Sequence, residues 1–302
     1  MTTTFEAFLD ENLDRVAFIS AWLRSRDIRH TVVELAGKRH IVVTFAPEAY
    51  DPRFRMKTLI AHHDRAAGTQ GANDNSAACY LLMQLSEKLS RARSAHNVRI
   101  IFTDGEEAAG ARGITGQGAF ALGSGLRKLG NGEDDVYVFD ACGRGDTLIL
   151  STAGFPAMDD DRRGRERKGR LYELMDDLHR RAAELARAVS PEAWVRLPTP
   201  YSDNAGFLAA GIPAQVITIL PHQEASVLLA SLAGHASDVD RLSRVIVANK
   251  PLDGDDPLAP IIPETWKMLH TERDNAASLT AAAFTLTETF LSALATRMDL
   301  AI

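Results

Sequence analysis

Imidazole and carboxylate side chains of metal-binding type recur along the chain, most of them directly after a short apolar run. In chain order they are His62, Asp74, the adjacent pair Glu106 and Glu107, Asp140 and His270. Such donors without thiolates suit one or two Zn²⁺ ions, or a harder divalent cation, in a hydrolytic site. An open α/β sheet gathers the ends of its parallel strands at one edge. We therefore expect these residues to form one site.

His62 and His63 are adjacent, and strand geometry distinguishes them. Alternate side chains of a strand share a face, which groups His62 with Asp64. A metal-bound imidazole usually donates its second N–H to a carboxylate, which sets its tautomer and orientation. Arg65 lies two residues after His63 and cannot accept that N–H. We expect His62 to be the ligand and Asp64 to orient it, the alternative being a hydrogen-bonded surface histidine.

Three further ligand candidates each have a structural alternative. Asp74 lies in the turn GANDN (71–75), where it either caps the next helix or sits near His62 as a carboxylate that can bridge two cations. Asp140 ends the apolar run VYVFD, so its charge needs a partner, either a metal, a helix N-terminus or Arg144. His270, in MLHTERD (268–274), is by itself more often structural than ligating.

Glu106 and Glu107 follow IIFTDG, and neighbouring side chains diverge. One carboxylate can therefore bind a metal while the other takes the proton of an activated water. A general base that is itself coordinated would lose much of its basicity. The alternative is a solvated acidic pair.

The elements that must position these residues alternate between strand-like and helix-like segments. Strands are predicted at 29–35 and 39–45, which form a hairpin, and at 58–63, 98–103, 136–141 and 214–220. Helices are predicted at 5–25, 76–92, 118–129, 170–189, 203–210, 225–233, 239–249 and 274–297. Continuous apolar runs suit strands buried on both faces. The fold class is α/β, a mostly parallel central sheet with helices on both faces.

The chain of 302 residues is expected to form a single catalytic domain over 1–302 with two interruptions. The first is a densely charged loop near 159–170, read as solvated, with a patch for phosphate or an acidic partner as the alternative. The second, near 221–263, is long enough to act as a lid.

Composition excludes several classes of protein. The net charge of −6 and pI near 5.9 give no reason to expect nucleic acid or an anionic membrane as partner. Cys79 and Cys142, the two cysteines, read as reduced thiols, although one bridge between them stays open. The acidic N-terminus does not resemble a secretory signal, and we expect a cytoplasmic protein.

Taken together, the segments AHHD (61–64), GANDN, TDGEEAAG (103–110), VFDACG (138–143), YSDNAGFLAAGIPA (201–214) and LHTERD (269–274) resemble the M28 family of zinc aminopeptidases. The likeness spans roughly 58–290. It implies the zinc-exopeptidase three-layer sandwich and two Zn²⁺ ions per chain. Asp74 would bridge them, His62 and Asp140 would complete one ion, and Glu107 and His270 the other. Glu106 would be the general base acting on a metal-bridging water, and Asp64 would orient His62.

The resemblance implies an exopeptidase, first of all an aminopeptidase that hydrolyses the N-terminal residue of small peptides or amino-acid amides. The alternatives are a dipeptidase or N-acyl amino acid deacylase with the same ligands, a single-zinc acyltransferase like glutaminyl cyclase, and a non-catalytic binding module. The segment YSDNAGF contains Ser202 and Asp203, to which we assign no catalytic role. The sequence leaves the oligomeric state open.

Overall fold

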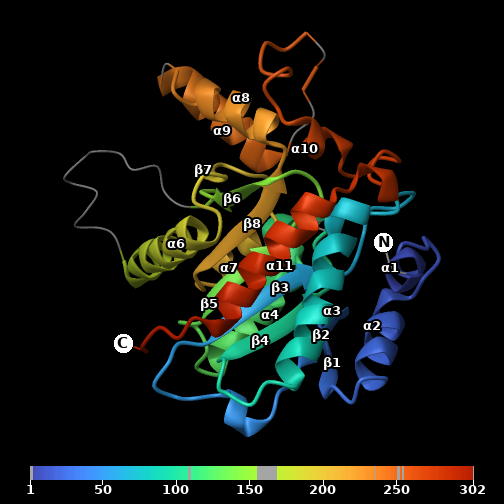
Figure 1. The fold of residues 1–302 in the computed structure, drawn as a ribbon. Coiled ribbons are helices and arrows are strands. Elements are labelled where there is room, and N and C mark those ends of the chain that lie inside the picture. Colours follow the sequence, from blue (N-terminus) through green and yellow to red (C-terminus); the bar gives the residue numbers. More distant parts are fainter. Residues whose placement is uncertain are drawn as a thin grey trace.

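The computed structural model describes residues 3–107, 110–154, 169–234, 236–249, 252–253 and 255–301. Its centre is one eight-stranded sheet in the order β1-β2-β4-β3-β5-β8-β6-β7 (Figure 1). The strands are β1 His30–Leu35, β2 Lys38–Val43, β3 Lys57–His62, β4 Val98–Thr103, β5 Asp135–Phe139, β6 Thr147–Ser151, β7 Trp194–Leu197 and β8 Ala214–Leu220. Strands β4, β3, β5 and β8 pair in parallel, whereas β1, β2 and β6 add antiparallel pairs.

Helices cover both faces of this sheet, as the strand patterns predict. They are α1 Thr3–Phe8, α2 Arg15–Arg24, α3 Ala77–Ser90, α4 Gly118–Lys128, α6 Arg170–Val189, α7 Asp203–Ala209, α8 His222–Ser231, α9 Ala236–Ala248, α10 Glu264–Met268 and α11 Ala281–Thr296. On one face α2, α3, α6 and α11 contribute to the largest apolar core, and on the other α4 and α7 form a second core. The predicted α/β sandwich is confirmed.

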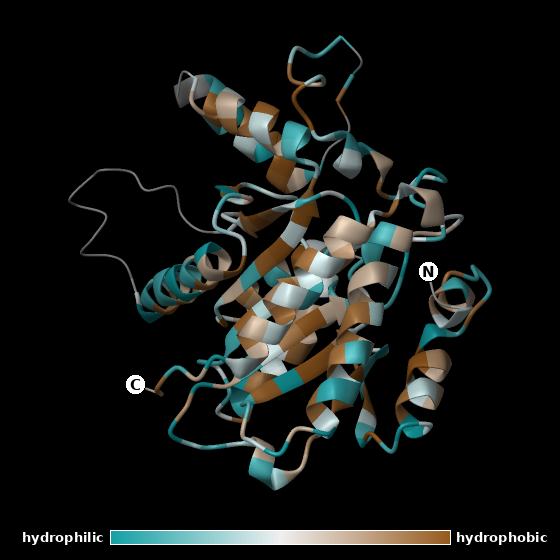
Figure 2. Ribbon diagram, viewed as in Figure 1, coloured by the Kyte–Doolittle hydropathy of each residue, from teal (hydrophilic) through white to brown (hydrophobic). Residues whose placement is uncertain are grey.

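Alternation along β3 shows how the sheet separates its two cores. Leu59 and Ala61 belong to the larger core, whereas Ile60 belongs to the core beneath α4 and α7. Both faces of this strand therefore pack against apolar side chains, and every residue of β3 is buried. Figure 2 shows the same pattern, with apolar strands enclosed between helices. Such a strand can present a polar side chain only at its end.

A buried ion cluster lies at the amino-terminal ends of β3 and β5. Asp135, the first residue of β5, accepts hydrogen bonds from the guanidinium groups of Arg55 and Arg181 at 2.7–3.1 Å. All three side chains are buried. The Lys57 ammonium, at the start of β3, donates to the carbonyls of Leu294 and Ala295 near the end of α11. These contacts hold the amino-terminal ends of β3 and β5 in place, at the end of the strands remote from the metal-type residues.

Several predicted boundaries differ from the structure. The N-terminal helix expected over 5–25 is two helices, because Asp14 caps α2 by accepting the N–H of Ala17. The last helix starts at Ala281 rather than 274, after a short turn, with Thr280 as its N-cap. The sheet also contains β6 and β7, which the apolar runs above do not include.

The two interruptions of the fold have different outcomes. Most of the charged loop near 159–170 lies outside the described residues, and Arg170 already begins α6. In the segment 221–263, α8 and α9 pack with β6, β7 and β8 around a third apolar cluster that includes Ile149, Leu228 and Ile246. Its action as a lid stays a prediction. No helix in the described ranges is long and apolar enough to cross a membrane.

Candidate metal centre

The metal-type residues meet at the carboxyl edge of three adjacent strands. His62 is the last residue of β3, and Asp140 directly follows β5. Glu106 and Glu107 lie just beyond β4, which pairs with β3 on its other side. Asp74 lies in the turn Ala72–Ser76 between β3 and α3, and His270 follows α10. The topology therefore brings together residues that are up to 208 positions apart, from His62 to His270.

Asp74 lies at the centre, with one carboxylate oxygen turned to each histidine. Its Oδ1 is 3.0 Å from His62 Nε2, which is 3.7 Å from Asp140 Oδ1. Its Oδ2 is 3.1 Å from His270 Nε2, which is 3.0 Å from Glu107 Oε2. Two three-residue donor sets result, and Asp74 belongs to both.

The spacing of these atoms fits tetrahedral zinc. Donors about 2.0–2.1 Å from a tetrahedral ion lie about 3.3 Å from one another. The observed separations of 3.0–3.7 Å bracket that value. Among the described atoms, buried His62 Nε2 makes no hydrogen bond despite its closeness to Asp74, and Glu107 Oε1 also has no partner. Atoms that approach without a hydrogen bond are expected where they point at a common cation.

Charge also favours a cation here. Burial alone would lower the pKa of His62, but the nearby carboxylates of Asp140, Asp64 and Asp74 outweigh burial and raise that pKa well above its usual value. Hydrogen bonds to Asp74 and Glu107 raise the pKa of His270 to about 11. Both histidines are therefore surrounded by an excess of negative charge that a divalent ion would neutralise.

Asp64 lies where it can support both His62 and the glutamate pair. Its backbone carbonyl is 3.2 Å from His62 Nδ1, and its carboxylate Oδ1 is 3.6 Å from the same atom. The carboxylate instead accepts the backbone N–H groups of Glu106 and Glu107, at 3.3 and 3.0 Å. The expected direct bond from His62 to the Asp64 carboxylate is thus replaced by its backbone carbonyl. The carboxylate orients the turn that carries both glutamates.

His63 points away from the donor sets. Its Nε2 lies 2.8 Å from the backbone carbonyl of Arg39, and burial lowers its pKa. Strand alternation therefore separates the two histidines in the way that the sequence pattern predicts. The ring that faces the carboxylates belongs to His62.

Asp74 is not a helix cap. The residue directly before α3, in the N-cap position, is Ser76, two residues after Asp74. The N–H groups of Asn73 and Asp74 donate to the two carboxylate oxygens of Asp274, at 2.7 and 3.0 Å. The turn is thus anchored to the segment that follows His270. No local sequence pattern predicts this anchor, because Asp274 lies 200 residues from Asp74 along the chain.

Glu106 lies beside the donor sets, and no described side chain donates a hydrogen bond to it. One of its oxygens groups with His62 and Glu107 within 4.8 Å. Burial raises the pKa of Glu106 well above its usual value, and the charges of Asp140, Asp203 and Asp74 raise it further. Asp203 is itself fully buried, accepts a hydrogen bond from the Thr103 hydroxyl and has its pKa raised to about 7, mainly by burial.

A small pocket opens beside Asp140. It is lined by Asp140, Ala141, Thr199, Pro200, Val216, Thr218, Trp266 and Leu269. Its walls are mostly apolar, and the indole of Trp266 is 5 % exposed. The residues come from segments far apart in sequence, which a one-dimensional pattern does not group.

Comparison with known proteins agrees with this geometry. Peptidase family M28 matches residues 40–294, which is most of the chain. No curated protein sequence matches significantly. Among solved structures, the LapA aminopeptidase of Legionella pneumophila has a TM-score of 0.61 at 16% identity, covering 98% of this chain and 70% of LapA.

Two further structures share the fold. The zinc aminopeptidase BSAP of Bacillus subtilis has a TM-score of 0.52 at 13% identity, over 86% of this chain and 53% of BSAP. The glutaminyl cyclase of Porphyromonas gingivalis has a TM-score of 0.56 at 14% identity, over 97% of this chain and 95% of that protein. Identities this low establish the fold rather than the activity. On the extent of the family match and the shared fold, the chain belongs to Peptidase family M28.

Proposed function

We propose that the protein is a zinc-dependent aminopeptidase that removes the N-terminal residue of small peptides. The observation that carries the proposal is the position of Asp74, which directs one oxygen into each of two donor sets. His62 and Asp140 would complete the site of one Zn²⁺, and Glu107 and His270 that of a second. When bound, zinc supplies Lewis-acid polarisation of the scissile carbonyl and a water of lowered pKa.

Glu106 is the proposed general base. Among the described residues no cationic side chain bonds to it, and burial raises its pKa, an effect that the charge of His62 only partly offsets. A carboxylate of this kind takes a proton readily from the attacking water and can pass it to the leaving amine. Asp64 keeps the Glu106–Glu107 turn in place through two backbone N–H groups.

Substrate selection follows from charge and shape. The site presents carboxylates of Asp74, Asp140 and Glu107 in close proximity. When two Zn²⁺ ions neutralise these carboxylates, a free α-amine would bind near one metal through its nitrogen lone pair, which an acylated amine cannot do because that lone pair is delocalised into the amide. The pocket next to Asp140 would receive the first side chain. Binding of the free amine favours an aminopeptidase over a deacylase, whereas either enzyme could use the pocket.

The test is an activity screen on zinc-reconstituted protein. Aminoacyl arylamides, N-acyl amino acids, dipeptides and an N-terminal glutaminyl peptide are supplied in parallel, with Glu106→Gln as the matched control. The proposal expects cleavage of free-amine arylamides and a loss of at least about 10²-fold in kcat for Glu106→Gln. Turnover of N-acyl substrates alone would indicate a deacylase, and cyclisation of the glutaminyl peptide would indicate an acyltransferase. Full activity in Glu106→Gln would contradict the proposed base.

A further inference from the structure

The N-terminal segment lies before the region that matches the family, which begins at residue 40. Its helix α2 nevertheless sends a side chain to the metal centre. Arg15, the first residue of α2, is 5 % exposed, and its guanidinium lies 4.8 Å from the centre of the Phe8 ring. A buried arginine is rare unless its donors are used.

The two terminal nitrogens of the guanidinium donate to two segments of the site, whereas Nε has no hydrogen-bond partner among the described residues. Nη1 donates to the carbonyl of His63 at 3.1 Å, and Nη2 donates to the carbonyl of Gln70 at 3.1 Å. Nη2 also donates to the Ser76 hydroxyl, which donates in turn to the carbonyl of Gly71. One planar group thus joins the end of β3 to the turn that follows it.

These contacts flank two ligand candidates of the same donor set. The carbonyl of His63 directly follows His62, and Gln70 and Ser76 bracket Asp74 on both sides. His62 Nε2 and Asp74 Oδ1 are 3.0 Å apart, so a shift of either segment would change the spacing of the set. Glu107 and His270 are carried by other segments.

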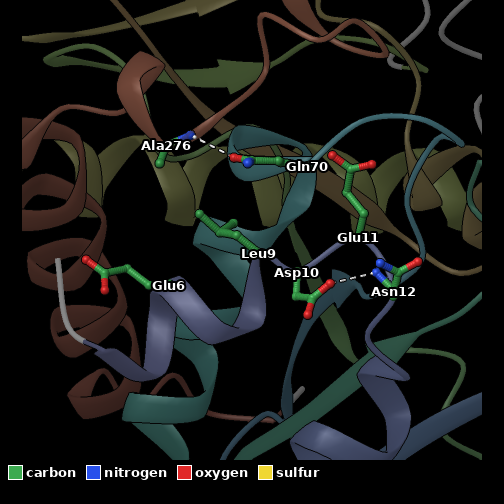
Figure 3. A pocket seen from close by; sticks show the side chains of 7 residues that line it. All are labelled: Glu6, Leu9, Asp10, Glu11, Asn12, Gln70 and Ala276. Atoms are coloured by element: carbon green, nitrogen blue, oxygen red, sulfur yellow. Dashed lines mark hydrogen bonds between the residues drawn. The ribbon is translucent and has the colours of Figure 1, made fainter.

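Gln70 extends the connection to the segment after His270. Its side-chain oxygen accepts the N–H of Ala276 at 3.3 Å, as Figure 3 shows, and Leu9 of the N-terminal segment lies in the same pocket wall. Arg65 donates to both the Gln70 and Leu9 carbonyls, at 3.2 and 3.3 Å. The N-terminal segment is therefore bonded to the turn on which Asp74 lies.

We propose that Arg15 is a positioning residue that holds His62 and Asp74 at the spacing needed for the first zinc ion. The proposal rests on the zinc site of the proposed function. A guanidinium is suited to this task because its donors form a rigid planar fork, whereas an ammonium is a single flexible point charge. A lysine at this position has its three donors on a single nitrogen, so it cannot occupy both positions that the separate Nη1 and Nη2 atoms of the arginine fill.

The experiment measures zinc binding to the folded, metal-free protein by titration against a competing chelator. The variants are Arg15→Met and Arg15→Lys, and the control is Arg26→Met, two residues beyond the end of the same helix. Arg26 stacks on Trp22 and pairs with Glu87 at 3.0 Å, so its loss removes a similar side chain without touching the centre. The role of Arg15 predicts that one of the two ions binds about 10- to 100-fold more weakly in Arg15→Met. The effect should be smaller in Arg15→Lys and absent in Arg26→Met.

A purely structural arginine would give a different result. It would lower the urea midpoint of the metal-free protein and leave zinc affinity of the folded protein unchanged, and that outcome would overturn the proposal. The visible spectrum of the Co²⁺-substituted protein is a second readout, expected to change most in Arg15→Met, less in Arg15→Lys and not in Arg26→Met. If Arg15→Met does not fold, zinc affinity is measured in Arg15→Lys and Ser76→Ala instead. Wild-type zinc affinity in both variants would refute the role of Arg15. Wild-type protein that binds no zinc would instead refute the proposed function itself.

Discussion

Asp274→Asn tests how the turn that carries Asp74 is held. The Asp274 carboxylate is 1 % exposed and accepts two backbone N–H groups, from Asn73 at 2.7 Å and from Asp74 at 3.0 Å. An asparagine has one acceptor oxygen, so its NH₂ group would face the second N–H. The variant loses one charge-assisted hydrogen bond, worth about 1.5–3 kcal/mol, and leaves a buried N–H unsatisfied at about 1–3 kcal/mol.

Part of that loss in the free energy of unfolding is offset, because asparagine carries no charge. Burial, together with the charge of Asp74, raises the pKa of Asp274 to about 6, so the carboxylate is itself held at a cost that asparagine avoids. We therefore expect a net loss near the lower end, about 2 kcal/mol in the free energy of unfolding. For a chain of 302 residues that is roughly 3 °C in Tm. Zinc affinity should fall by at least about tenfold, because the support of a ligand is removed.

The assay is urea denaturation of the metal-free protein together with a competitive zinc titration. Glu272→Gln is the control, since it removes an exposed carboxylate from the same segment. We expect that control to match wild type in both measurements. An Asp274→Asn protein with wild-type stability and wild-type zinc affinity would refute the view that this carboxylate anchors the turn.

Three further predictions concern other parts of the molecule. Asp135→Asn leaves two buried arginines without their carboxylate and should cost about 3–5 kcal/mol in urea denaturation. His96 is buried and accepts the N–H of Val98, and burial lowers its pKa to about 4. The neutral imidazole therefore stabilises the fold above pH 6.5. This stabilisation is lost as the pH falls toward 4. His96→Asn should therefore flatten the stability profile over that interval by up to about 3 kcal/mol. Trp266→Ala should enlarge the pocket next to Asp140. The kcat/KM for substrates with a large first side chain, divided by that for substrates with a small one, should rise by about tenfold or more.

Each of these has a distinct contrary outcome. An Asp135→Asn protein as stable as wild type would mean that the buried arginines find other partners. Parallel pH profiles for wild type and His96→Asn would show that this histidine does not titrate in the interval. Unchanged side-chain preference in Trp266→Ala would place the first side chain of the substrate elsewhere.

The local part of the site could be predicted from sequence because it depends on short-range geometry. Alternation along a strand separates His62 from His63, and adjacency separates Glu106 from Glu107. The parallel arrangement of apolar runs brings Asp140 to the same edge. In each case the determining geometry involves residues within a few positions of one another or the general layout of an α/β sheet.

The remaining contacts could not be predicted because they join distant segments. Arg15 bonds to groups 48, 55 and 61 residues away, and nothing near it in the chain indicates that its side chain is buried. Asp274 contacts Asn73 across 201 residues. The strand β6 is a five-residue apolar run whose partners, β7 and β8, lie far along the chain. Supporting contacts of this kind follow from tertiary packing rather than from local pattern.

The most direct measurement is a crystal structure of the zinc-loaded protein with anomalous data collected on both sides of the zinc absorption edge. The proposed centre predicts two anomalous peaks, one among His62, Asp74 and Asp140 and the other among Asp74, Glu107 and His270, with Asp74 contacting both. A single peak, or peaks away from Asp74, would contradict the dinuclear site.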